Sequence, residues 1–256
     1  MQRNRESRRV GLARALSKLG YCSRSQAAAL IRAGRVRLNG AARRDPEAPV
    51  HLGRDRIHVD GRAIDAASQI YLMLNKPRGV VTTASDEKGR PTVYSLLSEA
   101  LPWVGPVGRL DQASEGLLLL TNDSEWAARI TDPASHLDKT YHVQVAATGI
   151  ESLTEMLVTG VRCDRELLRA KQAGVLRLGE KNTWLEIVLD EGKNRQIRRM
   201  LEHSGVEVLR LVRVAIGPLV LGTLAKGHSR ALTPAEKKSL DQALKLPRRE
   251  QRAAKS

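Results

Sequence analysis

The chain has 256 residues, 41% of them hydrophobic, which is enough for a small domain beside a larger one with its own core. Its formal net charge of +15 is distributed as +9 over residues 1–66, zero over residues 67–225 and +6 over residues 226–256. Two basic ends around a neutral body favour a polyanionic partner, because a charge that served solubility alone would be spread evenly.

Several classes of protein are disfavoured. Cys22 and Cys163 lie far apart, so we expect small buried side chains in a reducing compartment rather than a disulfide. No apolar run has transmembrane length, and the first residues lack the apolar centre of a signal peptide. The histidines lack metal-ligand spacing, no glycine-rich phosphate loop is present, and Ser114 forms no nucleophile elbow. We therefore expect a soluble cytoplasmic protein without a metal or membrane attachment.

The first predicted elements are two short helices. Apolar positions over residues 10–19 follow one helix face, and Ser23 with Gln26 forms a capping box for a second helix that ends near residue 34. Two short strands follow, at residues 35–38 and 56–60, with an Asn-Gly hairpin signal after the first.

This helix pair and small β unit, with the sequence RVRLNG after the second helix, resembles the S4 RNA-binding domain over about residues 9–65. The resemblance implies that basic side chains of the helix pair contact RNA phosphates; the alternative is a solvated basic face. The candidate RNA-binding residues are Arg14, Lys18, Arg24, Arg32, Arg35 and Arg37.

The second part of the chain begins after a polar linker at residues 61–69. A strand at residues 70–74 leads into the sequence NKPRGVVTT, whose proline and glycine turn the chain with two cations at the tip. The charged loop at residues 85–91 is expected to help hold RNA, with an ordinary surface loop as the alternative.

The central stretch is GRLDQASEGLLLLTND, residues 108–123. Four leucines between a glycine and Thr-Asn-Asp predict a buried central strand. Asp111 is thereby fixed close to the core, at the end of a sheet. A carboxylate in such a place has either an ion-pair or hydrogen-bond partner or a functional role. From residue types alone, Asp111 capping a turn and pairing with Arg109 is the simpler interpretation.

The remaining pattern alternates helices and strands. We expect helices at residues 124–130 and 150–161, a half-buried strand at 139–145, a hairpin of 173–178 with 183–189, and final strands at 206–214 and 218–221. Between the hairpin and the final strands, EGKNRQIRRML predicts a helix whose apolar face is surrounded by cations.

Four of these stretches together resemble the motifs of pseudouridine synthases: NKPRGVVTT, GRLDQASEGLL, KTY and NRQIRR. The resemblance implies that Asp111 is the catalytic carboxylate, that Tyr141 lies against the target base, and that Arg198 pairs with the aspartate and keeps it ionised. The further substrate-binding candidates are Arg109, Lys76 and Ile197.

The resemblance also implies an α+β fold. We expect a disordered segment at residues 1–8, an S4-like (αL) domain at 9–66, a catalytic domain at 67–240 with a mixed, largely antiparallel sheet flanked by helices, and a basic flexible tail at 241–256. The pattern alone supports only an α/β or α+β domain of about 170 residues.

With both domains, the chain resembles the RsuA/RluB-type ribosomal RNA pseudouridine synthases. The implied activity is conversion of one uridine to pseudouridine in ribosomal RNA or a pre-ribosomal particle, with large-subunit RNA slightly favoured, by a monomer that needs no cofactor. The alternatives are a non-catalytic RNA-binding or ribosome-assembly factor and a synthase of transfer RNA. Intact Asp111, Tyr141 and Arg198 argue against the first, and the S4-like domain argues against the second.

Overall fold

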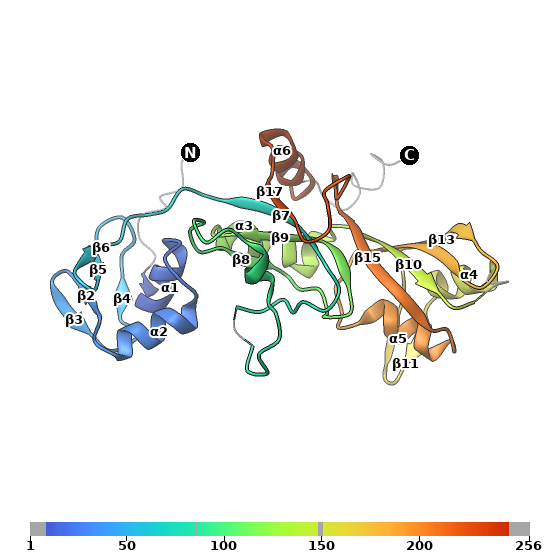
Figure 1. The fold of residues 1–256 in the computed structure, drawn as a ribbon, viewed down its shortest axis with the longest axis horizontal. Coiled ribbons are helices and arrows are strands. Elements are labelled where there is room, and N and C mark those ends of the chain that lie inside the picture. Colours follow the sequence, from blue (N-terminus) through green and yellow to red (C-terminus); the bar gives the residue numbers. More distant parts are fainter. Residues whose placement is uncertain (1–8, 85, 148–150, 246–256) are drawn as a thin grey trace. The chain divides into compact units, whose positions relative to one another are not determined.

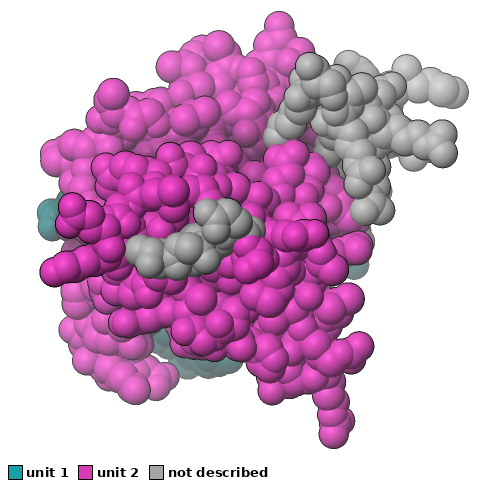
Figure 2. Space-filling view, turned by 90° about the vertical axis from the view of Figure 1, so that its right-hand side faces the viewer, with its two compact units in different colours: residues 1–70, 98–105, 120–124 teal, residues 71–97, 106–119, 125–256 magenta. Residues whose placement is uncertain are grey.

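The computed structural model describes residues 9–84, 86–147 and 151–245, and these form two compact units. The first unit comprises the described residues up to Ile70 together with 98–105 and 120–124, and the second comprises the rest (Figures 1 and 2). The expected disordered segment at 1–8 and most of the expected tail at 241–256 lie outside the described residues.

The first unit packs two helices against small β elements (Figure 1). Its elements are β1 (Val10–Gly11), α1 (Leu12–Lys18), α2 (Arg24–Arg32), β2 (Val36–Leu38), β3 (Ala41–Arg43), β4 (Pro49–Val50), β5 (Ile57–Val59) and β6 (Arg62–Ala63). The predicted capping box is present, since Ser23 Oγ accepts from the Gln26 backbone N–H. Leu12, Leu16 and Ile31 are fully buried in the core of this unit. β6 lies inside the segment predicted to be a linker, because Arg62 and Ala63 pair with β5.

The second unit is built on a mixed, largely antiparallel sheet, as expected. Its strands in spatial order are β13 (Gln172–Leu178), β14 (Thr183–Leu189), β10 (Lys139–Val145), β15 (Val208–Ile216), β9 (Glu115–Thr121), β7 (Tyr71–Lys76) and β17 (Ser229–Ala231), with β8 (Gly105–Val107) beside β9 and β16 (Leu219–Val220) beside β15. β9 and β15 run parallel, while β10 is antiparallel to both of its neighbours. All seven residues of β9 are buried, which confirms the predicted central strand.

Helices and a small hairpin cover this sheet. They are α3 (Ser124–Thr131), α4 (Glu151–Thr159), α5 (Gln196–His203), α6 (Pro234–Ala243), the short 3-10 helices η1 (Val93–Leu96) and η2 (Pro133–Ser135), and the pair β11 (Val161–Cys163) and β12 (Glu166–Leu168). Leu153, Leu157, Met200 and Leu201 from α4 and α5 form one core with β10 and β14. The other core joins β9 to α3 and α6.

The last helix, α6, was not expected. Thr233 and Glu236 form its capping box and Pro234 occupies its first turn, so the signal is the same one that identified α2. The helix runs to Ala243, which is three residues into the segment expected to be a flexible tail. Cys22 and Cys163 are free thiols. Within the described ranges, no helix is long and apolar enough to cross a membrane.

Candidate active site

The turn that carries Asp111 is held at five consecutive carbonyl groups. Two of these carbonyls accept from backbone N–H groups: the Asp111 carbonyl from Ser114 (3.0 Å) and the Gln112 carbonyl from Gly79 (2.8 Å). The Leu110 carbonyl accepts from Thr82 Oγ1 at 2.8 Å. The Ala113 carbonyl accepts from Arg198 Nη2 at 3.1 Å, and the Ser114 carbonyl accepts from Lys76 Nζ at 2.7 Å. Four of these five donors come from the NKPRGVVTT and NRQIRR stretches. Both motifs therefore fix the backbone on which Asp111 stands.

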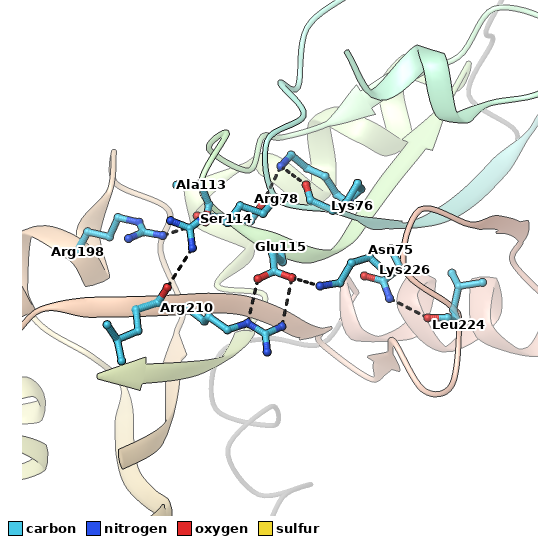
Figure 3. Close-up of polar contacts among 12 residues, drawn as sticks. Asn75, Lys76, Arg78, Ala113, Ser114, Glu115, Arg198, Arg210, Leu224 and Lys226 are labelled. Atoms are coloured by element: carbon cyan, nitrogen blue, oxygen red, sulfur yellow. Dashed lines mark hydrogen bonds and ion pairs between the residues drawn. The ribbon is translucent and has the colours of Figure 1, made fainter. Parts of the chain in front are cut away.

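Lys76 supplies one of these donors from a fully buried position at the end of β7. Its Nζ donates to the carbonyl oxygens of Ser114 and, at 3.0 Å, of Pro77, as Figure 3 shows. Burial lowers the pKa of Lys76 from 10.5 to about 8, although the carboxylates of Glu115 and Asp111 act in the opposite direction. Lys76 thus supports the turn from a position that solvent does not reach.

This buried amine predicts how stability changes with pH. Between about pH 8 and pH 10.5 the unfolded chain holds the Lys76 proton while the folded chain releases it, so stability rises with pH. The free energy of unfolding of the wild type, measured against Lys76→Met in urea, is expected to increase by about 3 kcal/mol between about pH 7.5 and pH 10.5. The exposed Lys181→Met is the control. Parallel curves for wild type and Lys76→Met would mean that the buried amine does not titrate in this window.

The ion pair of Asp111 differs from the expected one. The guanidinium within reach of its carboxylate is that of Arg195, with Nη1 3.8 Å from Oδ2, and both side chains are more than one-third exposed. Arg198 binds the Ala113 carbonyl instead, so it holds the turn rather than pairing with the carboxylate. Arg198 nevertheless faces the site and not solvent: it is half-buried, and the negative charge of Asp111 partly offsets the lowering of its pKa by burial and by Arg195.

Arg195 reaches Asp111 because its backbone is left-handed. It precedes α5 with φ +46°, and the other described non-glycine residues with positive φ are Asn, Asp or His, the types that adopt this conformation most readily. An arginine held there costs about 1 kcal/mol or more, and such outliers gather at functional sites.

The wall opposite Asp111 is formed by β10 and β15. Tyr141 pairs with Arg213 and Lys139 with Ile216, while Val214 has no partner in β10 and forms a bulge between them. Without the bulge, Ala215 would be the partner of Lys139. The extra residue shifts the pairing by one position, so Ile216 becomes the partner of Lys139 and joins this wall. Arg213 also pairs with Gly116 of the parallel strand β9. Arg213 therefore lies between Tyr141 on one side and, on the other, the strand that follows the Asp111 turn.

These elements enclose a cavity of about 520 Å3. Its charged lining includes Arg109, Asp111, Lys139, Lys193, Arg195, Arg198 and Arg213, and its apolar lining includes Leu110, Ile130, Tyr141, Leu189, Ile197, Leu211 and Ile216. The cavity thus brings together Asp111, Tyr141, Arg198, Arg109 and Ile197 from the sequence-based candidates, whereas Lys76 lies behind the turn. An apolar wall with a few polar groups suits a flat heterocycle attached to a polyanion.

A second cavity adjoins the first through Arg109, Leu110, Asp111 and Asn194. Its other side is the charged loop after NKPRGVVTT, where Asp86 accepts from the backbone N–H groups of Lys88 and Arg90 and from the Arg90 side chain. These bonds lower the pKa of Asp86 to about 2. Of the loop predicted at 85–91, residue 85 lies outside the described part of the chain.

Glu115 anchors the start of β9 beneath the turn. Its side chain is 4% exposed, and its carboxylate binds Arg210 Nε at 3.1 Å and Lys226 Nζ (Figure 3). Burial opposes ionisation, but these two cations outweigh it and hold the pKa of Glu115 below its usual value. The strand that carries Gly116 is therefore tied to β15 and to the loop before β17.

The cavity residues that were not among the sequence-based candidates include Lys139, Arg195 and Arg213. Lys139 precedes Tyr141 by two positions, so strand alternation places it on the same face and could have identified it. Arg195 and Arg213 depend on a left-handed residue and on a bulge, which a hydrophobic pattern does not reveal.

In the first unit, the basic residues that the sequence suggested for RNA binding differ in exposure and in their existing contacts. Arg14, Arg24, Arg32 and Arg37 are exposed and meet no carboxylate among the described residues. Arg35 is engaged with Asp60, since its Nε donates to Oδ1 at 2.9 Å and its Nη2 to Oδ2 at 2.5 Å. Lys18 is partly buried. Arg37 stands on β2 rather than on the helix pair.

Known proteins share both parts of the chain. Residues 70–203 match the family model described as RNA pseudouridylate synthase, and residues 10–57 match the S4 domain. The ribosomal large subunit pseudouridine synthase B of Bacillus subtilis is 36% identical over 90% of this chain and 94% of its own length. An RNA pseudouridine synthase of Aquifex aeolicus is 36% identical over 90% of this chain and 93% of its own. A crystal structure of a pseudouridylate synthase superposes with a TM-score of 0.63 at 31% identity, over 90% of this chain and 99% of that one.

Proposed function

The chain belongs to the RNA pseudouridylate synthase family and carries an S4 domain, and on that premise we propose that it converts one uridine of large-subunit ribosomal RNA to pseudouridine with Asp111 as the catalytic carboxylate. The observation that carries the proposal is the turn at Asp111. Its backbone is held at five successive carbonyls, while its carboxylate stays open to a cavity that also contains Tyr141.

The residue types suit the reaction. The N1–C1′ bond of the uridine breaks, the uracil turns, and C5 bonds to C1′, so no external electron or group donor is consumed. A uridine in structured RNA must first leave its stack, and the cavity of about 520 Å3 has room for a flipped nucleoside. Asp111 lies where the sugar would enter, and a carboxylate there can stabilise or capture the electron-deficient C1′ or remove a sugar proton. Tyr141 would pack on the uracil.

Large-subunit RNA is favoured over other substrates by the Bacillus subtilis relative, which is named for the large subunit and aligns over nearly its whole length. A non-catalytic RNA-binding factor is the alternative from another class. It is disfavoured because a protein that only binds RNA has no need to hold an ionisable group at the mouth of an open cavity.

The test of this function is tritium release from transcripts labelled at uridine C5, since C5 loses its hydrogen when it bonds to C1′. We expect release from large-subunit RNA or its precursor particles, and sequencing of the product would map the uridine. Release from small-subunit or transfer RNA alone would change the substrate but keep the reaction. No release from any of these would favour the binding-factor alternative.

We also propose that the first unit holds RNA phosphates through the exposed helix arginines. Arg14→Ala and Arg24→Ala are each expected to reduce the slope of log Kd against log salt by about 1, because each phosphate contact releases condensed counterions. Filter binding to the mapped RNA between low and physiological salt measures the slope. Arg35→Ala is the matched comparison, with a smaller expected effect because Asp60 already pairs with Arg35. Equal slopes for all variants would place the RNA elsewhere.

We also propose that the protein acts in the cytoplasm, where its proposed ribosomal RNA substrate would be met, and that it acts as a monomer. Light scattering of the protein at working concentration tests this, and a dimer would contradict it.

A further inference from the structure

Arg213 lines the cavity and has a buried hydrogen-bond donor that is not used within the described residues. The residue is 6% exposed, and its Nε donates to the Leu117 carbonyl at 2.8 Å. Its Nη2 is buried and meets no acceptor among the described residues. A buried guanidinium N–H without an acceptor is costly, and such groups call for an explanation in a native fold. Since Arg213 lines the cavity, an acceptor that arrives with the substrate would supply the missing bond.

The position of Arg213 indicates which part of the substrate it meets. In the antiparallel ladder it is the direct partner of Tyr141, so the two side chains stand side by side on the same face of the sheet. On its other side lies Gly116, five residues after Asp111. Whatever packs on Tyr141 therefore also lies next to Arg213.

The exposure of the cavity residues indicates which side of the cavity would take the base of the substrate and which side would take its phosphates. The side chains of Asp111 and Arg195 are 38% and 43% exposed, so they mark the open side of the cavity, while Arg213 marks its buried side. A phosphate stays connected to the rest of the RNA and is expensive to desolvate, whereas an uncharged flat base is not. The apolar side chains of Leu211 and Ile216 beside Arg213 fit a base as well.

The buried side of the cavity is also electropositive. Burial is the main cause that lowers the pKa of Lys139, and the nearby charge of Arg213 lowers it further. Asp138 and Asp190 oppose this effect. A site with two cations near its apolar wall favours a ligand that carries or develops negative charge.

We propose that Arg213 donates Nη2–H to a carbonyl oxygen of the target uracil and stabilises the uracil anion formed during the reaction. This rests on the proposed function. When the N1–C1′ bond breaks, both electrons stay with the uracil, and the charge spreads over N1, O2 and O4. The electron-deficient C1′ is left facing Asp111. C5 then bonds to C1′, the hydrogen of C5 leaves as a proton to water, and N1 takes up a proton from water, so the product is neutral and no net proton is gained or lost.

One donor serves both orientations of the ring. Turning the uracil about the axis through N3 and C6 exchanges N1 with C5 and O2 with O4. A fixed donor that binds one carbonyl before the turn therefore meets the other carbonyl after it. Arg213 is suited to this role because Nε is anchored to the β9 backbone, so the Nη2 donor does not follow the ring.

The test begins with the uridine mapped by the wild type. Arg213→Met is expected to lower kcat for tritium release by about 10²–10³-fold, the usual cost of losing one buried donor to a developing anion, with RNA affinity nearly unchanged. Arg177→Met on β13 is the control, because Arg177 is exposed and does not line the cavity.

A second comparison separates contact with the base from a structural role. An RNA fragment with tritiated 2-thiouridine or 4-thiouridine at the mapped position replaces a carbonyl oxygen by sulfur, a weaker acceptor. The sulfur changes ring acidity equally for both enzymes, so the informative quantity is the ratio of oxygen to sulfur rates. We expect this ratio to be smaller in Arg213→Met than in wild type, because the contact that distinguishes oxygen from sulfur is already lost.

An unchanged ratio in Arg213→Met would overturn the proposal, and it is also the result expected if Arg213 binds a phosphate or only supports the fold. If Arg213→Met does not fold, the same ratio is measured in Arg213→Lys, which keeps a cation but lacks the Nη2 geometry. Tritium release by the wild type establishes the reaction independently, so failure of this proposal is distinct from failure of the proposed function.

Discussion

Asp111→Asn is expected to lower tritium release from large-subunit RNA by at least about 10³-fold while RNA affinity stays within a few-fold of wild type. Asparagine keeps the size of the side chain but can neither capture C1′ nor take a proton. RNA affinity persists because the basic surface of the first unit is untouched. The fold persists as well: the Asp111–Arg195 pair is 3.8 Å long and partly exposed, so its loss changes stability by less than about 1 kcal/mol.

The matched control for this variant is Glu202→Gln. Glu202 lies 4.0 Å from the same Arg195 but is two-thirds exposed and does not line the cavity. Glu202→Gln therefore removes a carboxylate close to the same arginine but leaves the carboxylate in the cavity intact. We expect its activity to be close to wild type. Single-turnover tritium release measures both variants. Release by Asp111→Asn within about tenfold of wild type would show that another group performs the step assigned to Asp111.

Local signals in the sequence identified most of the fold, and their limits are physical. The capping box of Ser23 predicted α2 because a cap is a contact between residues three apart. The four leucines predicted β9 because an unbroken apolar run has no polar face to expose. The same cap signal at Thr233 marks α6 equally well, so that helix was predictable from its sequence.

The site was predictable in its residues but less so in its contacts. Resemblance pointed to Asp111, Tyr141 and Arg198, and the structure brings all three to one cavity. Which arginine faces the carboxylate depends on the left-handed backbone at Arg195, a choice that no periodicity encodes. Burial of Arg213 depends likewise on tertiary packing, since an arginine in a strand is ordinarily expected at the surface.

Gly116 shows how closely β9 is held against β15. Its φ is +102°, outside the range that residues with a Cβ adopt readily, and a Cβ built there would lie 2.2 Å from the Arg213 carbonyl oxygen. That neighbour is backbone of a paired strand, so it cannot rotate away as a side chain would. The glycine is therefore what permits β9 and β15 to approach so closely at the point where the Asp111 turn ends.

Gly116→Ala is accordingly expected to lower the free energy of unfolding by about 2–6 kcal/mol, the sum of backbone strain and of forced separation of the two strands. Urea unfolding followed by tryptophan fluorescence measures it, since Trp126 and Trp184 both lie in the second unit. Gly222→Ala separates the two causes: its φ is +60° but nothing lies within 4 Å of its Cβ, so only strain remains.

The same substitution also tests the coupling between fold and chemistry. Where Gly116→Ala is still folded, separation of β9 from β15 would move Asp111 away from Tyr141 and Arg213, and a displacement of about 1 Å can cost about 10²-fold in rate. We therefore expect kcat to fall under conditions in which fluorescence shows a native protein. A folded variant with unchanged kcat would mean that the turn is positioned by its carbonyl contacts to Lys76, Gly79 and Arg198 alone, independently of the strand that follows it.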